Sequence, residues 1–333
     1  MYSFHILYDD IWTCFACKQS GDLSELRRLG DDRLRLTLEQ VGKEPEPQGL
    51  VIVGEYLKPK QSDGYATGFN LLDRMIGGLI PGMLTVITGK RAEGKSTFAG
   101  QMALNLVNDD IPVCFYSGEL NASTFQSWIV TQAAGKNFLE QYTDKFGEIR
   151  YTADQWAEQR IKAWLGKKLI LYDGSVSGVN AERNTIMDRF SLAHKRYGCR
   201  VFVVDNLMTA RVEIDHDRDF YRAQSNFVRD LLEFAVKNDV HVVLIAHPRK
   251  NDMGDKNDNI SGSADITNLA HNVMRVAKTT EQEKKEYDCE SIIEVTKNRQ
   301  WGDSGAIRMN FDKPTRRFIA LDGTQTTTYG WEG

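Results

Sequence analysis

Short runs of apolar residues recur along most of the chain, and longer stretches with helical spacing separate the first several of them. The strand-like runs are Leu84–Thr88, Val113–Tyr116, Lys168–Tyr172, Val201–Val204, His241–Ile245, Val273–Val276, Ile292–Val295 and Ala306–Phe311. The helical stretches include Ser96–Val107, Ala181–Tyr197 and Asp219–Asn238. Apolar strands that alternate with helices predict an α/β fold with a mostly parallel sheet covered on both faces. The last strands follow one another after short gaps, which predicts an antiparallel edge.

The same pattern divides the chain into three zones. Residues 1–31 are aromatic and cysteine-bearing, and residues 32–62 are polar and are predicted to form a helix followed by a linker. Residues 63–325 carry the α/β pattern. We therefore predict one mononucleotide-binding α/β domain with a small N-terminal appendage.

Composition narrows the class of protein. The 333 residues are 41% hydrophobic and 26% charged, which excludes a disordered or low-complexity chain. Because the formal net charge is −4, any contact with nucleic acid has to come from a local basic patch. No apolar run approaches the roughly 18–20 residues of a membrane span, and the N-terminus lacks the features of a secretory signal. Of the five cysteines only Cys14 and Cys17 lie close together, so we expect no disulfide framework and a reducing, cytoplasmic setting.

The clearest motif follows the run Leu84–Thr88 and opens the next helical stretch, where the pattern G-x-x-x-x-G-K-[ST] is present. Its glycines allow backbone N–H groups to surround phosphate oxygens, and the helix N-terminus adds positive potential. Lys95 is expected to reach the β- and γ-phosphates, and Ser96 to supply an oxygen to Mg²⁺. The sequence therefore predicts a nucleoside-triphosphate site that contains Gly89, Arg91, Ala92, Glu93, Gly94, Lys95, Ser96 and Thr97.

A second acidic element is needed to hold the metal ion. Asp205 ends the run Val201–Val204, and the carboxyl ends of the strands are where open α/β sheets bind ligands. Asp173 ends a similar run and is the alternative, although the Gly174-Ser175 pair that follows it also fits a plain turn. We favour Asp205 because its strand is wholly apolar and a full amphipathic helix precedes it.

Hydrolysis also needs a group that orients or deprotonates the attacking water. Glu119 follows the run Val113–Tyr116 and would project from its carboxyl end toward the γ-phosphate. A glutamate at this position is also a common partner of a helix dipole, so the residue pattern leaves both roles open.

His247 ends a further apolar run, and a polar loop from Pro248 to Asn259 follows it. A histidine at this edge can sense the γ-phosphate, or it can be structural. The loop is either a solvated surface segment or a contact for nucleic acid through Arg249, Lys250 and Lys256.

Two cations, Lys297 and Arg299, end the run Ile292–Val295 and precede a turn. They form either an exposed tip or a pair of cations that a neighbouring subunit's nucleotide would meet, as in the arginine-finger arrangement.

In this order, the motifs resemble the RecA-like motor of DnaB-type replicative helicases, which belong to superfamily 4. His247 and the loop after it are most similar to the phage primase–helicase and Twinkle branch. The resemblance covers roughly residues 64–321 and rests on Thr67-Gly68-Phe69-Asn70, Gly77-Gly78-Leu79, the phosphate loop, Ser117-Gly118-Glu119-Leu120, Val204-Asp205, Ile245-Ala246-His247 and Lys297-Asn298-Arg299.

This resemblance implies an ATP- or other NTP-driven DNA helicase that forms a homo-hexamer around single-stranded DNA and works with a separate primase or polymerase. It implies that Glu119 is the catalytic base, that Lys95, Ser96 and Asp205 hold phosphate and Mg²⁺, and that His247 is a sensor. Arg299 with Lys297 would act across the subunit interface.

The N-terminal zone resembles the second half of the zinc ribbon of bacterial and phage primases, in Ser3-Phe4-His5-Ile6, Trp12-Thr13-Cys14-Phe15-Ala16-Cys17 and Gly21-Asp22-Leu23. A structural Zn²⁺ site wants four ligands, and this zone offers Cys14 and Cys17, with His5 poorly spaced. We expect Zn²⁺ only if residues upstream complete the ribbon. A chance pair or a redox motif is the alternative reading of the two cysteines.

Two other functions fit the same domain. A RecA/RadA-like recombinase would form filaments rather than closed rings, and a KaiC-like signalling ATPase would hydrolyse nucleotide without a DNA role. Lys297-Asn298-Arg299 and the strand that ends in His247 favour the helicase.

Overall fold

The computed structural model describes residues 4–7, 11–14, 20–22, 53–54, 63–173, 186–210, 220–247, 264–324 and 326–333. The chain divides into two compact units, Met1–Gln61 and Ser62–Gly333. In the described part of the smaller unit, an antiparallel sheet has the order β1-β2-β3, with β1 at Phe4–Leu7, β2 at Ile11–Cys14 and β3 at Ser20–Asp22. The helix predicted within residues 32–62 lies outside the described residues, apart from a turn at residues 53–54.

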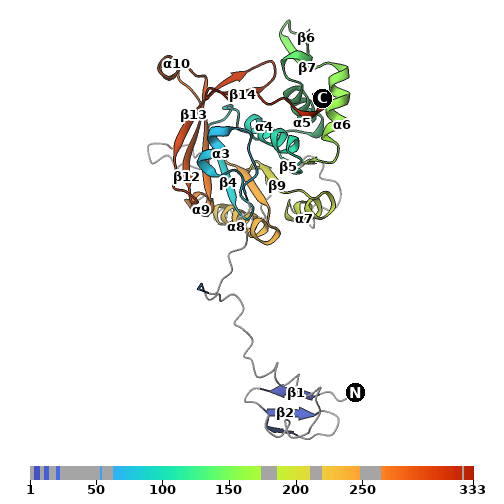
Figure 1. Cartoon of the computed structure of the whole chain (residues 1–333), viewed down its shortest axis with the longest axis vertical. Helices are drawn as coiled ribbons and strands as arrows, with labels where there is room; N and C mark the ends of the chain where they lie inside the picture. Colours follow the sequence, from blue (N-terminus) through green and yellow to red (C-terminus); the bar gives the residue numbers. More distant parts are fainter. Residues whose placement is uncertain are drawn as a thin grey trace. The chain divides into compact units, whose positions relative to one another are not determined.

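The larger unit is built on one large sheet (Figure 1). Its strands in spatial order are β14-β13-β12-β11-β4-β10-β9-β5-β8. In chain order they are β4 (Leu84–Thr88), β5 (Val113–Ser117), β8 (Leu169–Asp173), β9 (Val201–Asp205), β10 (His241–Ile245), β11 (Asn272–Lys278), β12 (Ser291–Asn298), β13 (Gly305–Asp312) and β14 (Arg317–Ala320). The strands from β11 to β8 pair in parallel, while β12, β13 and β14 pair antiparallel. The predicted parallel sheet with an antiparallel edge is therefore confirmed.

Helices cover both faces of this sheet because its central strands alternate between two apolar cores. On β5, Phe115 belongs to one core and Cys114 to the other. On β9, Val203 belongs to the first core and Phe202 to the second. The first core packs against α3 (Asn70–Ile76), α4 (Lys95–Asn108), α5 (Ala122–Ala134) and α6 (Gln155–Leu165), and the second against α7 (Ile186–Tyr197), α8 (Phe220–Asn238) and α9 (Ala264–Leu269).

Three strands of the larger unit were not predicted. A hairpin, β6 (Leu139–Thr143) with β7 (Ile149–Ala153), lies between α5 and α6 and exposes most of its side chains. Without a buried face, these strands lack the apolar run that identifies a strand in sequence. The third is β14, which has only four residues. The remaining elements are η1 (Lys136–Phe138), α10 (Glu281–Tyr287) and η3 (Gly330–Glu332).

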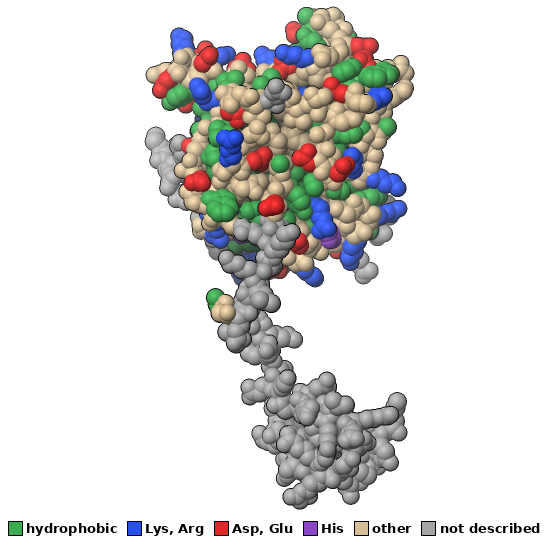
Figure 2. Space-filling view, in the orientation of Figure 1, with side chains coloured by type: hydrophobic (Ala, Val, Ile, Leu, Met, Phe, Trp, Pro, Cys, Tyr) green, Lys and Arg blue, Asp and Glu red, His purple; other side chains and the backbone are tan. Residues whose placement is uncertain are grey.

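Beyond the predicted domain end at residue 325, Tyr329 and Trp331 are buried in the first core. Among the described residues, no helix is long and apolar enough to span a bilayer. On the face drawn in Figure 2, acidic and basic side chains are interspersed, as the small net charge implies.

The direction of each strand decides which side chains can meet. The carboxyl ends of β4, β5, β9, β10 and β11 lie along one edge of the sheet, which we call the carboxyl edge. Because β12 runs antiparallel to β11, its own carboxyl end lies at the opposite edge, where Asn298 pairs with Asn272 at the start of β11.

Candidate nucleotide site

The loop between β4 and α4 has a backbone that glycine alone adopts readily. Gly94 has a φ of +94° and Gly89 a φ of +146°. A Cβ atom at Gly89 would lie 2.1 Å from the carbonyl oxygen of Val276 on β11. Glycine at this position therefore allows the loop to pass against the neighbouring strand and reach the start of α4.

Lys95, the first residue of α4, is turned into the loop. Its Nζ donates hydrogen bonds of 2.8 Å to the carbonyl oxygens of both Gly89 and Lys90. Burial lowers the pKa of Lys95, and the nearby Glu93 carboxylate opposes that shift. The loop therefore presents a cation that is only partly hydrated beside the backbone amides at the start of the helix.

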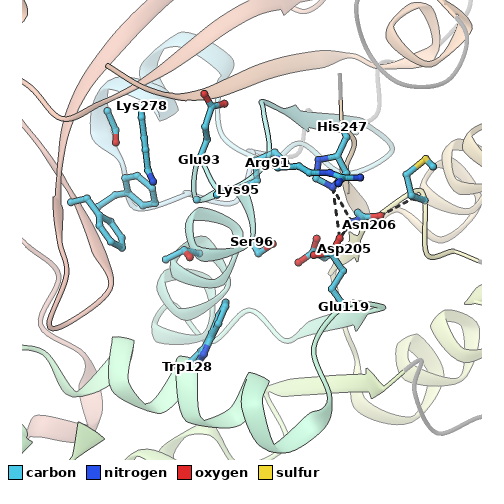
Figure 3. Close-up of a pocket in the computed structure, with 17 residues that line it drawn as sticks. Arg91, Glu93, Lys95, Ser96, Glu119, Trp128, Asp205, Asn206, His247 and Lys278 are labelled. Atoms are coloured by element: carbon cyan, nitrogen blue, oxygen red, sulfur yellow. Dashed lines mark hydrogen bonds and ion pairs between the residues drawn. The ribbon is translucent and has the colours of Figure 1, made fainter. Parts of the chain in front are cut away.

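Asp205, at the end of β9, lies beside Ser96, as Figure 3 shows. Burial raises the pKa of Asp205 to about 6, although a hydrogen bond with the Ser96 side chain acts in the opposite direction. Its Oδ1 atom is buried and has no hydrogen-bond partner among the described residues. A buried carboxylate oxygen without a partner, next to a serine hydroxyl, matches the oxygen donors that Mg²⁺ prefers. Ser96 and Asp205 therefore fit a magnesium site.

Glu119, Asn206 and His247 form a polar cluster across three strand ends (Figure 3). The Nδ2 atom of Asn206 donates a hydrogen bond to Oε1 of Glu119 and lies 3.2 Å from Nε2 of His247. The Nε2 atom of His247 is 3.7 Å from Oε1 of Glu119. Because an amide nitrogen donates, the contact between Asn206 and Nε2 is a hydrogen bond in the tautomer that has its proton on Nδ1, an atom that is buried and has no hydrogen-bond partner among the described residues. Burial and the positive charge of Lys95 lower the pKa of His247, which favours a neutral imidazole, although the Glu119 carboxylate opposes the shift.

The sequence did not predict Asn206 as a residue of this site. Its side chain also accepts a hydrogen bond of 2.9 Å from the backbone N–H of Met208, so the amide is oriented by the turn that follows β9. The peptide bond between Asp205 and Asn206 is cis. The only signal in the sequence is that Asn206 directly follows Asp205, and that signal does not reveal contact with two residues far along the chain.

Asp173, the alternative to Asp205, lies elsewhere. Its Oδ2 atom accepts a hydrogen bond of 2.9 Å from the backbone N–H of Ala122 at the start of α5. Asp173 therefore contacts a helix N-terminus, and it does not line the cleft described next. Glu119 precedes α5 and its N-cap Asn121, so it does not lie in the first turn of the helix.

A cleft of about 580 Å³ runs along the carboxyl edge. The predicted residues that line it are Arg91, Ala92, Glu93, Gly94, Lys95, Ser96, Thr97, Glu119, Asp205 and His247. The others come from α5, the turn after β9, the end of β11 and the antiparallel edge, and they were not predicted: Trp128, Asn206, Met208, Lys278, Ser291, Phe311 and Phe318. The cleft therefore joins the phosphate loop to an aromatic wall that the end of the sheet supplies.

Lys297 and Arg299 do not line this cleft. Both lie at the opposite edge of the sheet, at the carboxyl end of β12. The Nζ atom of Lys297 donates a hydrogen bond of 2.5 Å to the carbonyl oxygen of Thr267, and the Arg299 guanidinium donates to that of Asn268. These two cations therefore cannot reach the nucleotide site of their own chain.

Several predicted residues remain untested. Arg249, Lys250 and Lys256 lie outside the described residues, as does Cys17. Cys14 ends β2, and no group of three or more His, Cys, Asp or Glu side chains able to hold a metal ion occurs in the part of the chain that is described. Zn²⁺ binding is therefore unsupported.

Known proteins share the fold and the sequence pattern of the larger unit. A relative from Arabidopsis thaliana, "Twinkle homolog protein, chloroplastic/mitochondrial", is 24% identical over 264 residues, which are 76% of this chain and 36% of that protein. The chain therefore spans about a third of the length of this relative.

Two solved structures are also similar. One is a DnaB-like replicative helicase that was described with its interactions with primase; it is 19% identical, with a TM-score of 0.63 over 90% of this chain and 70% of its own. The other is a KaiC-like protein from Pyrococcus horikoshii OT3, which is 15% identical, with a TM-score of 0.52 over 79% of this chain and 99% of its own. At these identities, the likeness shows the fold alone.

The profile of one protein family matches residues 64–320 of this chain. That match begins just before Thr67-Gly68-Phe69-Asn70 and ends after β14, so it spans the whole sheet and every predicted residue of the cleft. With more than three quarters of its residues matched, the chain belongs to the DnaB-like helicase C-terminal domain family.

Proposed function

We propose that this protein is an NTP-driven DNA helicase that translocates on single-stranded DNA and unwinds duplex at a replication fork. One observation carries the proposal: the predicted residues Lys95, Glu119, Asp205 and His247, which follow four different strands, line one cleft. Membership of the DnaB-like helicase family supports the same activity.

In this proposal the phosphate loop holds the triphosphate. Backbone amides at the start of α4 and the Lys95 ammonium group neutralise the β- and γ-phosphates, and Ser96 with Asp205 holds Mg²⁺. When bound, Mg²⁺ supplies positive charge that stabilises the phosphate oxygens in the transition state.

Glu119 orients the attacking water and accepts its proton. The hydrogen bond from Asn206 fixes one carboxylate oxygen, so the other oxygen of Glu119 is left for the water. Because the same amide also contacts Nε2 of His247, a change at the γ-phosphate that moves Glu119 is transmitted to His247 and to the segment after it. His247 thereby acts as a sensor of the nucleotide state.

The proposal extends to an assembly. Lys297 and Arg299 act on the nucleotide of a neighbouring copy in a homo-hexamer, since they lie at the edge opposite their own cleft. Arg249, Lys250 and Lys256 contact single-stranded DNA, and a primase or polymerase is a further partner.

The test is a nucleotide-hydrolysis assay with and without single-stranded DNA, together with displacement of a strand from a forked duplex. We expect single-stranded DNA to raise the hydrolysis rate, and Lys95→Ala to lower hydrolysis and unwinding by at least about 100-fold. The control is Lys195→Ala, which removes an exposed lysine on α7. Unwinding that survives Lys95→Ala would contradict the proposed mechanism.

The other two functions are distinct outcomes of the same experiment. Hydrolysis that single-stranded DNA leaves unchanged would favour a KaiC-like ATPase. DNA-dependent filaments in electron micrographs, without closed rings or strand displacement, would favour a RecA/RadA-like module.

A further inference from the structure

The turn that follows β12 is held in place by one buried side chain. The Oδ1 atom of Asn298 accepts hydrogen bonds from the backbone N–H groups of Gln300, at 3.1 Å, and Trp301, at 3.2 Å. Its Nδ2 atom donates a bond of 2.7 Å to the carbonyl oxygen of Met75, at the end of α3. Asn298 is only 7% exposed, so the turn presents its outer residues on a fixed base.

The outer residues include two cations without a carboxylate partner. Within the described residues, Lys297 and Arg299 donate to backbone carbonyl groups and form no ion pair. Their charges are therefore available to an anionic surface that approaches this edge of the sheet.

Trp301 lies beside these cations and is 54% exposed. Its indole rests against the backbone of Gly77, where a Cβ atom would lie 2.9 Å from Nε1. A large aromatic side chain left half in water on a rigid turn, next to an arginine, has the composition typical of an interface hot spot.

The opposite edge of the same sheet has the complementary chemistry. The cleft there contains the carboxylates of Glu93, Glu119 and Asp205 together with the cations Arg91, Lys95 and Lys278, so its negative charge comes from the triphosphate that the proposed function places there. Met208 lines it as well and is 49% exposed. One edge has two cations and an exposed aromatic ring, and the other has a cleft for an anionic triphosphate and an exposed methionine. These two surfaces suit a head-to-tail contact between copies of one chain.

We infer that Trp301 is the apolar anchor by which one copy of this chain docks beside the nucleotide cleft of a second copy. This inference rests on the proposed function, which already assigns Lys297 and Arg299 to a neighbour's nucleotide; it adds the residue that holds the two subunits together. Asn298 positions the anchor and Arg299 in a fixed relation, so that docking of the indole delivers the guanidinium.

The experiment measures assembly and hydrolysis of the full-length Trp301→Ala variant. We expect it to shift the assembly midpoint, measured by sedimentation velocity, to at least about ten-fold higher subunit concentration. Hydrolysis should fall at low concentration and recover as concentration rises. Trp301→Phe, which keeps an apolar ring, should lie between wild type and Trp301→Ala. The matched control is Trp156→Ala, since Trp156 on α6 is 53% exposed and should leave assembly unchanged.

A mixing experiment separates docking from an effect within one subunit. Trp301→Ala subunits have an intact cleft, and Lys95→Ala subunits have an intact turn after β12. Adding Lys95→Ala subunits to Trp301→Ala subunits should restore hydrolysis at interfaces between the two variants. Wild-type assembly by Trp301→Ala, or a loss of hydrolysis that neither concentration nor mixing reverses, would overturn the inference. If the wild type hydrolyses no nucleotide, the proposed function fails, and sedimentation alone still tests the anchor.

Discussion

Asp205 and Lys95 are both buried at the phosphate loop. Burial raises the pKa of Asp205 and lowers the pKa of Lys95, so it favours the neutral form of each side chain. The cost of these buried charges is compensated when a bound nucleotide and metal ion neutralise them. At the scale of single residues, the cleft is therefore less stable when it is empty than when it is filled. Two predictions at this scale concern Asp205 and Asn206.

The first concerns Asp205. Its pKa of about 6 in the folded chain is higher than in the unfolded chain, so the folded state binds this proton more tightly. The charged carboxylate therefore lowers stability above about pH 6, less so as the pH falls, and not at all below about pH 4. Without nucleotide and Mg²⁺, Asp205→Asn should raise the free energy of unfolding by on the order of 3 kcal/mol at pH 8, while hydrolysis is lost.

Thermal unfolding of the two proteins between pH 4 and pH 8 checks this prediction. The stabilisation should disappear toward pH 4, where both side chains are neutral. Asp173→Asn is the control, because this carboxylate also ends a parallel strand but does not line the cleft. An Asp205→Asn variant that is less stable than wild type at pH 8 would show that burial does not govern this carboxyl group.

The second residue-scale prediction concerns Asn206. Asn206→Ala removes the hydrogen bond that fixes Glu119 and the contact with His247, but leaves the phosphate loop untouched. We expect kcat for nucleotide hydrolysis to fall by about 10- to 100-fold, and KM to change little, because in the proposed mechanism Asn206 positions the base Glu119 and does not bind phosphate. Steady-state kinetics measure both constants. Asn238→Ala at the end of α8 is the control, and a change in KM alone would contradict the positioning role.

At the scale of elements, the antiparallel edge holds the phosphate-loop helix. Gln101 on α4 is buried and pairs with the backbone of Phe318 on β14: its Nε2 donates to the carbonyl oxygen at 2.9 Å, and its Oε1 accepts from the N–H at 2.7 Å. Arg317 on β14 donates to the carbonyl oxygens of Gln132 and Ala133 on α5. The shortest strand of the sheet therefore ties together two helices that line the cleft.

Removal of this link should destabilise the larger unit. Gln101→Ala leaves the N–H and carbonyl groups of Phe318 without these partners, and we expect a loss of about 2–3 kcal/mol in the free energy of unfolding. Chemical denaturation measures this loss. Gln126→Ala, at an exposed position of α5, should change stability by less than about 0.5 kcal/mol. Equal stability of the two variants would show that the link does not hold α4 to the sheet.

At the scale of the whole molecule, the sheet has two chemically different edges. The carboxyl edge contains the nucleotide cleft, and the opposite edge contains Lys297, Arg299 and Trp301. In the proposed mechanism, the opposite edge of one copy completes the site of another, so copies associate head to tail, which produces a ring if the rotation closes.

The prediction at this scale is complementation between two inactive variants. Arg299→Ala subunits keep the cleft, and Lys95→Ala subunits keep Arg299, the cation that we propose acts on a neighbour's nucleotide. In an equal mixture, about a quarter of the interfaces combine an intact cleft with an intact arginine, so hydrolysis should recover to about a quarter of the wild-type rate. Rate measurements across mixing ratios give the answer. No recovery at any ratio would show that Arg299 acts within its own subunit or is only structural.

The phosphate loop and the positions of the main strands along the chain were accessible from sequence because their signals are local. Gly89, Gly94 and Lys95 lie within seven consecutive residues, and each apolar run is short and continuous. The hairpin of β6 and β7 was not accessible, because its exposed side chains follow no buried pattern. The aromatic wall of the cleft was also missed, since Phe311 and Phe318 lie more than 200 residues beyond the loop.

The sequence alone determined the α/β class, the candidate phosphate site and the candidates Glu119, Asp205 and His247, because each depends on residues near to one another in the chain. Only the tertiary structure decided that Asn206 joins Glu119 to His247, that Asp173 contacts a helix start, and that Arg299 lies opposite the cleft. Those results depend on strand order and strand direction, which arise from the packing of the whole sheet.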